Sequence, residues 1–237
     1  MRPVDKGTSP ISGDFCKYED ALPYLIQRLG NYCSYCERSF EAGLSVEHIC
    51  PKSTHEDLEK KWDNFLIACT QCNSSKGHRD IKPNELKEYV WPDTDDTYHM
   101  IDYPALKAYQ AEPNNDLDEQ TKQRVQKTID LVNINYSTDV YGQTTYKNKL
   151  LKRQEVVKEC KRLKNNYINA KELYDLRNIA PLNLQKNIEE NFKSAIENII
   201  SAAKEYGCWS IWMKLFEEIP EIKEGLLKWD GTNVSYF

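Results

Sequence analysis

Hydrophobic residues recur every three or four positions over most of the C-terminal half of the chain. This spacing places them on one face of an α-helix. The helices that it predicts cover residues 117–132, 146–178, 181–206, 209–216 and 222–227. Gly207 and Pro220 separate the last three, because both residue types interrupt helices. We therefore expect the C-terminal part of the chain to be all-helical.

The first 30 residues have a different pattern, which predicts an extended arm followed by one short helix. Residues 1–20 contain two prolines and two glycines and show no hydrophobic periodicity, as is typical of an extended segment. Residues 21–29 form a helical pattern, and Gly30 follows at the position where glycine commonly ends a helix. The apolar face of this helix holds Leu22, Leu25, Ile26 and Leu29.

Composition changes twice along the chain and suggests three regions. Residues 31–80 are dense in cysteine, histidine and asparagine, and residues 81–112 contain three prolines without periodicity. Leu44 and Val46 alternate with polar residues, which predicts a short β-strand. We expect an α+β protein with an arm and small metal-held domain over residues 1–84, a connector over 85–112 and a helical domain over 113–237.

Size and charge limit the function classes. The chain has 237 residues, 40% of them hydrophobic and 29% charged, which is typical of a globular protein with a real core. No apolar stretch is long enough to span a membrane, and no signal-peptide pattern follows Met1, so we expect a cytoplasmic protein. A protein that binds many nucleic-acid phosphates without a partner usually has an excess of basic residues, whereas this chain has a net charge of -5. Either a local patch or a partner must supply affinity for nucleic acid.

Four of the eight cysteines form two close pairs, Cys33-x-x-Cys36 and Cys69-x-x-Cys72. In a reducing compartment such thiols stay free, and two such pairs offer the tetrahedral ligand set that structural zinc prefers. The alternative is four unrelated buried cysteines, which are common in cores. A redox function of the thioredoxin type requires a βαβ context that is missing here. The spacing therefore favours a structural zinc ion.

The residues between and after these pairs supply candidates for chemistry. Glu47 and His48 stand at the end of the predicted strand, and a carboxylate beside a neutral imidazole can bind a divalent cation and activate a water. Asn73 is predicted to start a helix, where its amide oxygen can reach the same metal. Lys76, one turn later, is a candidate for contact with a substrate phosphate. Taken alone, a Glu-His pair is more often two solvated side chains on a protein surface without a catalytic role.

Three further features have an ordinary structural alternative. His78 is a second candidate for the phosphate or the metal site, and a solvated helix end is equally consistent with its position. Asp93 lies in an acidic turn where capping is favoured over a second metal site. The basic stretch over residues 147–164 suggests a nucleic-acid track, but the interleaved Glu155 and Glu159 favour a solvated helix face.

The order of these motifs resembles that of the HNH endonucleases with a ββα-metal core. The residues that carry the resemblance are Cys33, Cys36, Glu47, His48, Pro51, Asn64, Cys69, Cys72, Asn73 and Lys76. It implies that His48 is the general base and that Glu47 and Asn73 hold a catalytic Mg²⁺ or Mn²⁺. It also implies that Asn64 braces the loop and orients His48, while the cysteines hold zinc. Asn73 departs from the histidine common at its position, and suits an oxygen-ligated metal.

A narrower resemblance, to the PtuB-like HNH proteins of Septu-type and retron-associated antiphage systems, extends over most of the chain. Its segments are residues 1–7, 28–33, 46–48, 72–77, 91–93, 207–212 and 231–237. It implies a bacterial defence effector that acts with a PtuA-like ATPase and, in retron-associated members, a reverse transcriptase with its RNA-linked DNA. The helical domain would hold the partner. DNA is the expected substrate. The alternatives are RNA, including tRNA, and a zinc-knuckle scaffold without catalysis.

Overall fold

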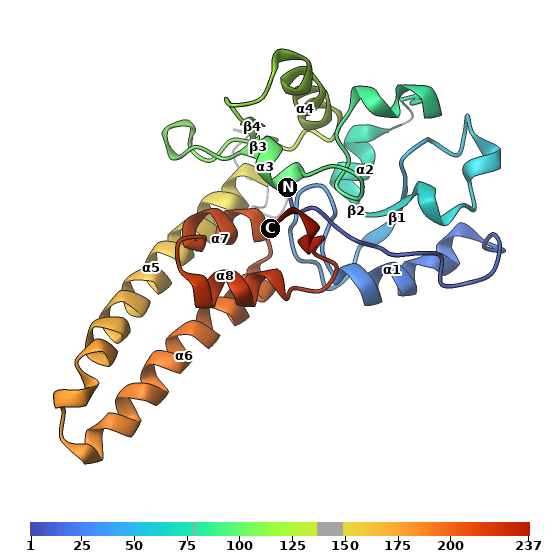
Figure 1. The fold of residues 1–237 in the computed structure, drawn as a ribbon. Helices are drawn as coiled ribbons and strands as arrows, with labels where there is room; N and C mark the ends of the chain where they lie inside the picture. Colours follow the sequence, from blue (N-terminus) through green and yellow to red (C-terminus); the bar gives the residue numbers. More distant parts are fainter. Residues whose placement is uncertain (78, 137–148) are drawn as a thin grey trace, which may run out of the picture.

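Two antiparallel strands and the helix that follows them form the centre of the N-terminal region (Figure 1). In this computed structural model, which describes residues 1–77, 79–136 and 149–237, β1 (Leu44–His48) pairs with β2 (Phe65–Cys69), and α2 (Thr70–Lys76) continues directly from β2. The register runs from Leu44 opposite Cys69 to His48 opposite Phe65. The predicted strand is therefore confirmed. The helix begins at Thr70, three residues before Asn73, where the sequence had placed its start.

Burial explains why this hairpin forms. Every residue of β2 is buried, as expected for a short continuous apolar run, whereas β1 is buried only from Val46 onward. Helix α1 (Leu22–Leu29) packs against β2 and buries Leu25 and Leu29, and Gly30 ends it with a positive φ of 77°. The first 17 residues run along this core as an arm that leads into the 3-10 turn Tyr18–Ala21. The predicted arm and short helix are both found.

The middle of the chain is built from short elements. A 3-10 helix (Pro83–Glu88) is followed by α3 (Thr97–Met100) and by the small antiparallel pair β3 (Ile101–Asp102) and β4 (Glu112–Pro113). Helix α4 (Glu119–Leu131) then begins at the N-cap Asp118, whose carboxylate accepts a hydrogen bond from the Thr121 amide. Helix α4 matches the first predicted helix, whereas the pairing of β3 with β4 was not predicted, and the bounds of the connector stay a prediction.

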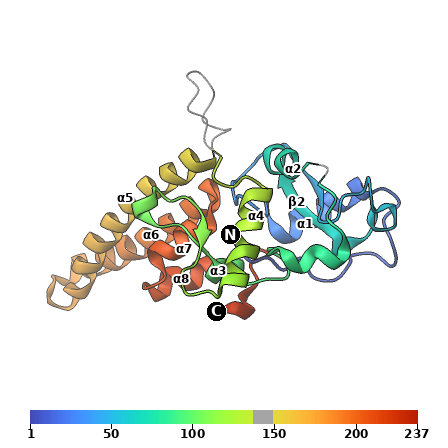
Figure 2. The ribbon, with the colours of Figure 1, turned by 90° about the horizontal axis from the view of Figure 1, so that it is seen from above.

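Two long helices form a hairpin that extends away from the rest of the molecule (Figures 1 and 2). They are α5 (Lys149–Asp175) and α6 (Leu182–Tyr206), and they pack along each other. Of the predicted apolar stripe on α6, only Ile199 and Ala203 are fully buried, because the outer part of the hairpin has no further layer over it. Residues 146–148 of the predicted helix lie outside the described residues.

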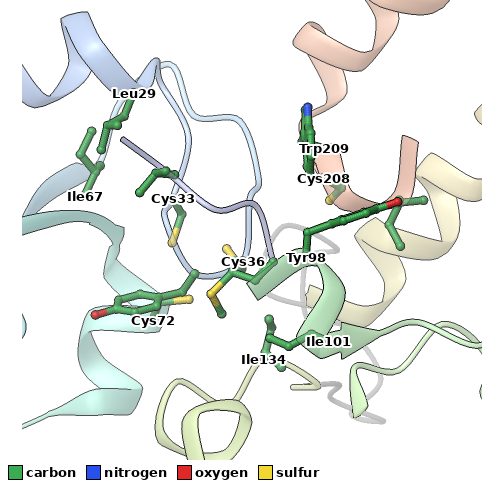
Figure 3. Close-up of a cluster of buried hydrophobic side chains, with 14 of the residues drawn as sticks. Leu29, Cys33, Cys36, Ile67, Cys72, Tyr98, Ile101, Ile134, Cys208 and Trp209 are labelled. Carbon is green, nitrogen blue, oxygen red and sulfur yellow. The ribbon is translucent and has the colours of Figure 1, made fainter. Parts of the chain in front are cut away.

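Helices α7 (Trp209–Phe216) and α8 (Pro220–Leu227) pack at the inner end of the hairpin. Trp209, Trp212 and Phe216 are buried there, and the helix matches the predicted segment 209–216. One hydrophobic cluster joins these helices to the hairpin of β1 and β2 (Figure 3), so the division at residues 84 and 113 stays a prediction. No helix among the described residues is long and apolar enough to cross a membrane. The predicted fold class, a small α+β core followed by a mostly helical region, is confirmed.

Candidate zinc site and active site

The four predicted zinc ligands meet at one point. Cys33 and Cys36 lie in the loop after α1, Cys69 ends β2 and Cys72 lies in the first turn of α2. Their sulfur atoms all lie within 4.8 Å of one another, and those of Cys36 and Cys69 are 3.8 Å apart. A tetrahedral zinc ion with Zn–S bonds of about 2.3 Å separates its sulfurs by about 3.8 Å. Figure 3 shows the sulfurs of Cys33, Cys36 and Cys72 pointing toward one another, so this buried cluster fits structural zinc.

Arg38 lies against this sulfur cluster. Its guanidinium donates to Cys36 Sγ at 3.4 Å and to Cys69 Sγ at 3.6 Å. Burial opposes ionisation of the Cys36 thiol, but bonds with the other three thiols and the charge of Arg38 lower its pKa well below the usual range. Donors of this kind offset the negative charge of zinc-bound thiolates. No motif in the sequence marked Arg38, apart from its position two residues after Cys36.

A cavity of about 590 Å³ opens beside the zinc site. It is lined from three directions, by the end of β1, by the loop that follows it and by one face of α2. Of the predicted site residues, it brings together Glu47, His48, Asn73 and Lys76. Two antiparallel strands joined directly to a helix place these side chains side by side, because β2 sets the position of α2 relative to β1.

His48 is fixed on three sides. Its imidazole Nε2 lies 2.8 Å from the backbone carbonyl oxygen of Glu59. The rings of Tyr18 and Phe65 contact the imidazole in edge-to-face geometry, with centroids at 4.9 and 5.3 Å. A carbonyl oxygen only accepts hydrogen bonds, so the proton is on Nε2 and the lone pair on Nδ1. Burial lowers the pKa of His48 and favours this neutral form.

Glu47 forms a buried ion pair with Lys76. The Lys76 ammonium lies 2.8 Å from Glu47 Oε1 and donates a hydrogen bond of 2.6 Å to the His48 carbonyl oxygen. Burial raises the pKa of Glu47, and the positive charge of Lys76 opposes that rise. Both side chains are almost inaccessible to solvent. The predicted phosphate contact of Lys76 stays a prediction, and in this structure its ammonium faces protein groups.

Two oxygen atoms in the cavity suit a hard divalent cation. The Glu47 carboxylate pairs with the Lys76 ammonium through Oε1, at 2.8 Å, so its second oxygen is the one that remains for a cation. The Asn73 amide donates through Nδ2 to Ser45 Oγ at 3.3 Å, which leaves its carbonyl oxygen without a partner among the described residues. Carboxylate and amide oxygens are the ligands that Mg²⁺ and Mn²⁺ prefer. Glu47 and Asn73 therefore fit the metal that the sequence implied, and their role as ligands stays a prediction.

Asn64 lies behind the cavity and holds the loop that follows β1. Its Oδ1 accepts from the Cys50 amide at 2.7 Å, and its Nδ2 donates to the carbonyl oxygens of Cys50 and Leu58 at 2.9 and 3.2 Å. The Ile49 amide donates to the Asn64 carbonyl oxygen at 2.9 Å. These bonds span the segment that carries both His48 and the Glu59 carbonyl. The geometry is what a brace for His48 requires.

The remaining candidates lie elsewhere. His78 lies outside the described residues. Asp93 does not line the cavity, and its carboxylate accepts a hydrogen bond of 2.7 Å from Lys6. The cavity is also lined by residues that no motif had assigned to the site, among them Tyr18 from the N-terminal arm and Lys52 from the loop after β1. No motif marked Tyr18, since the arm has no periodic pattern.

Comparison with known proteins agrees with this geometry. Residues 33–79 match the HNH endonuclease family. The chain is also 35% identical over 65 residues to the Septu protein PtuB of Bacillus thuringiensis, an alignment that covers 26% of this chain and 25% of that protein. The chain thus matches about a quarter of the length of this relative, which is distant and partial homology. The segment from Cys33 to Arg79, with its four-cysteine cluster and its β-hairpin and helix, is an HNH endonuclease domain.

Proposed function

We propose that this protein is a metal-dependent endonuclease that hydrolyses phosphodiester bonds of nucleic acid, with DNA as its default substrate. The observation that carries the proposal is the cavity that collects Glu47, His48 and Asn73 beside the zinc cluster. A zinc-knuckle scaffold requires the cysteines but has no use for a buried carboxylate, a neutral imidazole and a free amide oxygen in one cavity. The domain match to HNH endonucleases supports the same activity.

The chemistry follows from the state of His48. With its proton on Nε2 and bonded to the Glu59 carbonyl, the imidazole presents Nδ1 as the base that takes a proton from the attacking water. Asn64 keeps the loop in place, so that this orientation persists through the reaction. A divalent cation held by Glu47 and Asn73 would neutralise charge on the scissile phosphate and on the leaving 3′ oxygen.

The test compares three full-length proteins on end-labelled DNA and RNA, including tRNA, in Mg²⁺ and in Mn²⁺. We expect the wild type to cleave and His48→Ala to lose about 10²- to 10⁴-fold in rate, since general-base catalysis contributes about that much. His99→Ala is the matched control, because His99 lies on α3, outside the cavity. Cleavage by His48→Ala at the wild-type rate would remove His48 as the base. Cleavage of RNA alone would move the assignment to an RNA-directed nuclease, because phosphate and metal contacts do not select the sugar.

We further propose that the protein acts in the bacterial cytoplasm as the effector of an antiphage system, with a PtuA-like ATPase and, in a retron-associated system, a reverse transcriptase with its RNA-linked DNA. The partial identity to PtuB supports this assignment. The helical region offers a docking surface at the tip of its hairpin, where Ile179 and Leu182 are 83% and 86% exposed. Exposed apolar clusters on soluble proteins commonly mark protein interfaces.

This partner proposal has its own test. The protein is co-expressed with the PtuA-like ATPase of the same genome, and the complex is measured by size-exclusion chromatography. We expect Ile179→Asp with Leu182→Asp to weaken the complex and to leave DNA cleavage by the isolated chain unchanged. Leu106→Asp is the control, since Leu106 is also exposed but lies far from the hairpin in sequence. A complex unaffected by the double variant contradicts the proposed docking surface.

A further inference from the structure

The cavity has two lysines among its described lining residues, Lys52 and Lys76, and they are in opposite electrostatic situations. Lys76 is 2% exposed, and its ammonium is occupied by Glu47 and by the His48 carbonyl oxygen. Turning this ammonium toward a ligand would break its bond to the His48 carbonyl oxygen and, without a bound cation, leave a buried carboxylate without its counter-ion, which is strongly unfavourable. Lys76 is therefore bound in place as an internal counter-ion.

Lys52 is held more loosely and faces solvent. Its side chain is 42% exposed, and its ammonium lies 3.8 Å from Glu59 Oε1, at the outer limit of an ion pair. The same ammonium lies 3.8 Å from the centre of the Tyr18 ring, which is a cation–π contact. A partly exposed pair of this kind contributes little to stability. Replacing the Glu59 carboxylate by a nucleic-acid phosphate as the partner of the Lys52 ammonium therefore costs little free energy.

Tyr18 connects this lysine to the candidate base. One contact of its ring is with the His48 imidazole and another is with the Lys52 ammonium. The arm that carries Tyr18 is anchored nearby, because Phe15 stacks on Trp62 at 6.1 Å and packs against Phe65 at the same distance. The Lys52 ammonium is thus held on the His48 side of the cavity, beside the position where a scissile phosphate would meet the base.

We propose that Lys52, held over the ring of Tyr18, binds a backbone phosphate of the nucleic-acid strand at this cavity, and that Lys76 is a positioning residue for Glu47 and His48. The inference rests on the proposed nuclease function and assigns its substrate contact. The ligand class is the phosphodiester, because an exposed ammonium next to a tyrosine ring offers charge and a stacking face but no pattern of donors that reads a base. Tyr18 is a second positioning residue, acting through Lys52 and His48.

The experiment measures binding rather than cleavage. Full-length protein carrying His48→Ala is titrated with a fluorescently labelled DNA duplex and with RNA of the same sequence, over a series of salt concentrations. The loss of one phosphate contact lowers the slope of log K against log salt by about 0.9 on duplex DNA, which weakens binding about eightfold at 0.1 M salt. We expect this result for Lys52→Gln in the same background, and recovery by Lys52→Arg. Lys193→Gln on α6 is the matched control and keeps the original slope.

The other variants separate the two roles. Lys76→Gln is expected to lower the melting temperature and to keep the salt slope, since its charge pairs within the protein. Tyr18→Phe keeps the ring and is expected to bind like the parent, whereas Tyr18→Leu is expected to lose part of the affinity. If Lys76→Gln lowers the slope and Lys52→Gln does not, the assignment is overturned and Lys76 is the phosphate contact. Nucleic-acid binding with an unchanged slope in Lys52→Gln overturns the inference alone, whereas absence of all binding by the His48→Ala parent overturns it together with the nuclease function.

Discussion

The imidazole of His48 donates a hydrogen bond from Nε2 to the backbone carbonyl oxygen of Glu59, at 2.8 Å. This single bond selects the tautomer that leaves Nδ1 free to accept a proton. Glu59 contributes through its backbone, so any residue at this position supplies the same acceptor. The orientation of the candidate base therefore depends on the path of the loop between β1 and β2, more than on a specific side chain.

His48 is buried, and its burial predicts how the imidazole titrates. Because burial lowers its pKa, the folded protein takes up the proton at lower pH than the unfolded chain does. Stability from this group is therefore complete above about pH 6.5, the ordinary value for histidine, and is lost as pH falls toward the lowered pKa. NMR titration of the imidazole nitrogens in zinc-loaded protein without added Mg²⁺ or Mn²⁺ should give a pKa below 6.5 and the Nε2-protonated form. His48→Asn should remove this part of the pH dependence, and a pKa above 6.5 would contradict the prediction.

The brace formed by Asn64 predicts a stability defect with a loss of activity. Asn64→Ala removes three hydrogen bonds to the backbone of Cys50 and Leu58 and leaves buried groups without partners. We expect the free energy of unfolding to fall by about 2 to 3 kcal/mol. Cleavage should also slow, because the loop that fixes His48 loosens.

A matched control separates this effect from the loss of any asparagine. Asn166 lies exposed on α5, so Asn166→Ala should change stability by less than about 0.5 kcal/mol and leave cleavage unchanged. Urea unfolding followed by circular dichroism measures both variants. Equal stability of the two variants would show that the bonds of Asn64 contribute nothing to the loop.

The features of the fold that the sequence alone predicts are those encoded in short, local patterns. The paired cysteines predicted the sulfur cluster, because a zinc site requires a fixed spacing within each pair. The helices from Glu119 to Leu227 were predicted because their hydrophobic period is long and regular. The grouping of Glu47, His48 and Asn73 in one cavity matched the motif order. Each of these patterns involves residues close together in the chain or in a fixed motif order, so the folded structure keeps the arrangement that the pattern predicts.

Contacts between distant segments left no signal in the sequence. Tyr18 reaches His48 only because the arm folds back over the β-hairpin, and nothing in the arm indicates that path. The motif marked Lys76 as a charged candidate but did not indicate its ion pair with Glu47, which lies 29 positions earlier in the chain. The sequence states which charges are available, but their partners depend on tertiary packing.

The cysteine cluster predicts one zinc ion per chain and a strict dependence of the fold on it. Cys69→Ser removes one thiolate from the buried set, and zinc binding supplies folding free energy on the order of 10 kcal/mol in small zinc domains. We expect the variant to lose zinc and the folded state of the N-terminal region. Zinc content by mass spectrometry and the melting temperature measure both effects.

Cys160→Ser provides the comparison for this variant. Cys160 is as buried as Cys69 but lies on α5, outside the sulfur cluster. The Cys160→Ser variant should keep full zinc content and lose only the small packing energy of one sulfur. A Cys69→Ser protein that is folded and free of zinc would contradict a structural role for the metal.

Gly207 packs against residues 37–39, the end of the loop that carries Cys33 and Cys36 and is called the zinc loop below. This contact predicts an effect of one added methyl group. Gly207 ends α6 with a φ of 71°, and a Cβ there would lie 2.5 Å from the Glu37 carbonyl oxygen and 2.6 Å from the Ser39 amide nitrogen. The Cys208 amide donates to that same carbonyl oxygen at 2.8 Å, so the close approach cannot relax without breaking this bond. Gly207→Ala should therefore destabilise the protein by about 3 kcal/mol or more, from the left-handed backbone and the collision together.

Gly13→Ala isolates the backbone part of this cost. Gly13 has a φ of 80°, but a Cβ at this position meets nothing within 4 Å. It should cost only the conformational penalty of about 1 to 2 kcal/mol. The difference between the two variants, measured by urea unfolding, reports how tightly α6 is joined to the zinc loop. If the two glycines give equal losses, the junction yields to the added methyl group, and the helical region is coupled to the nuclease core more loosely than these distances imply.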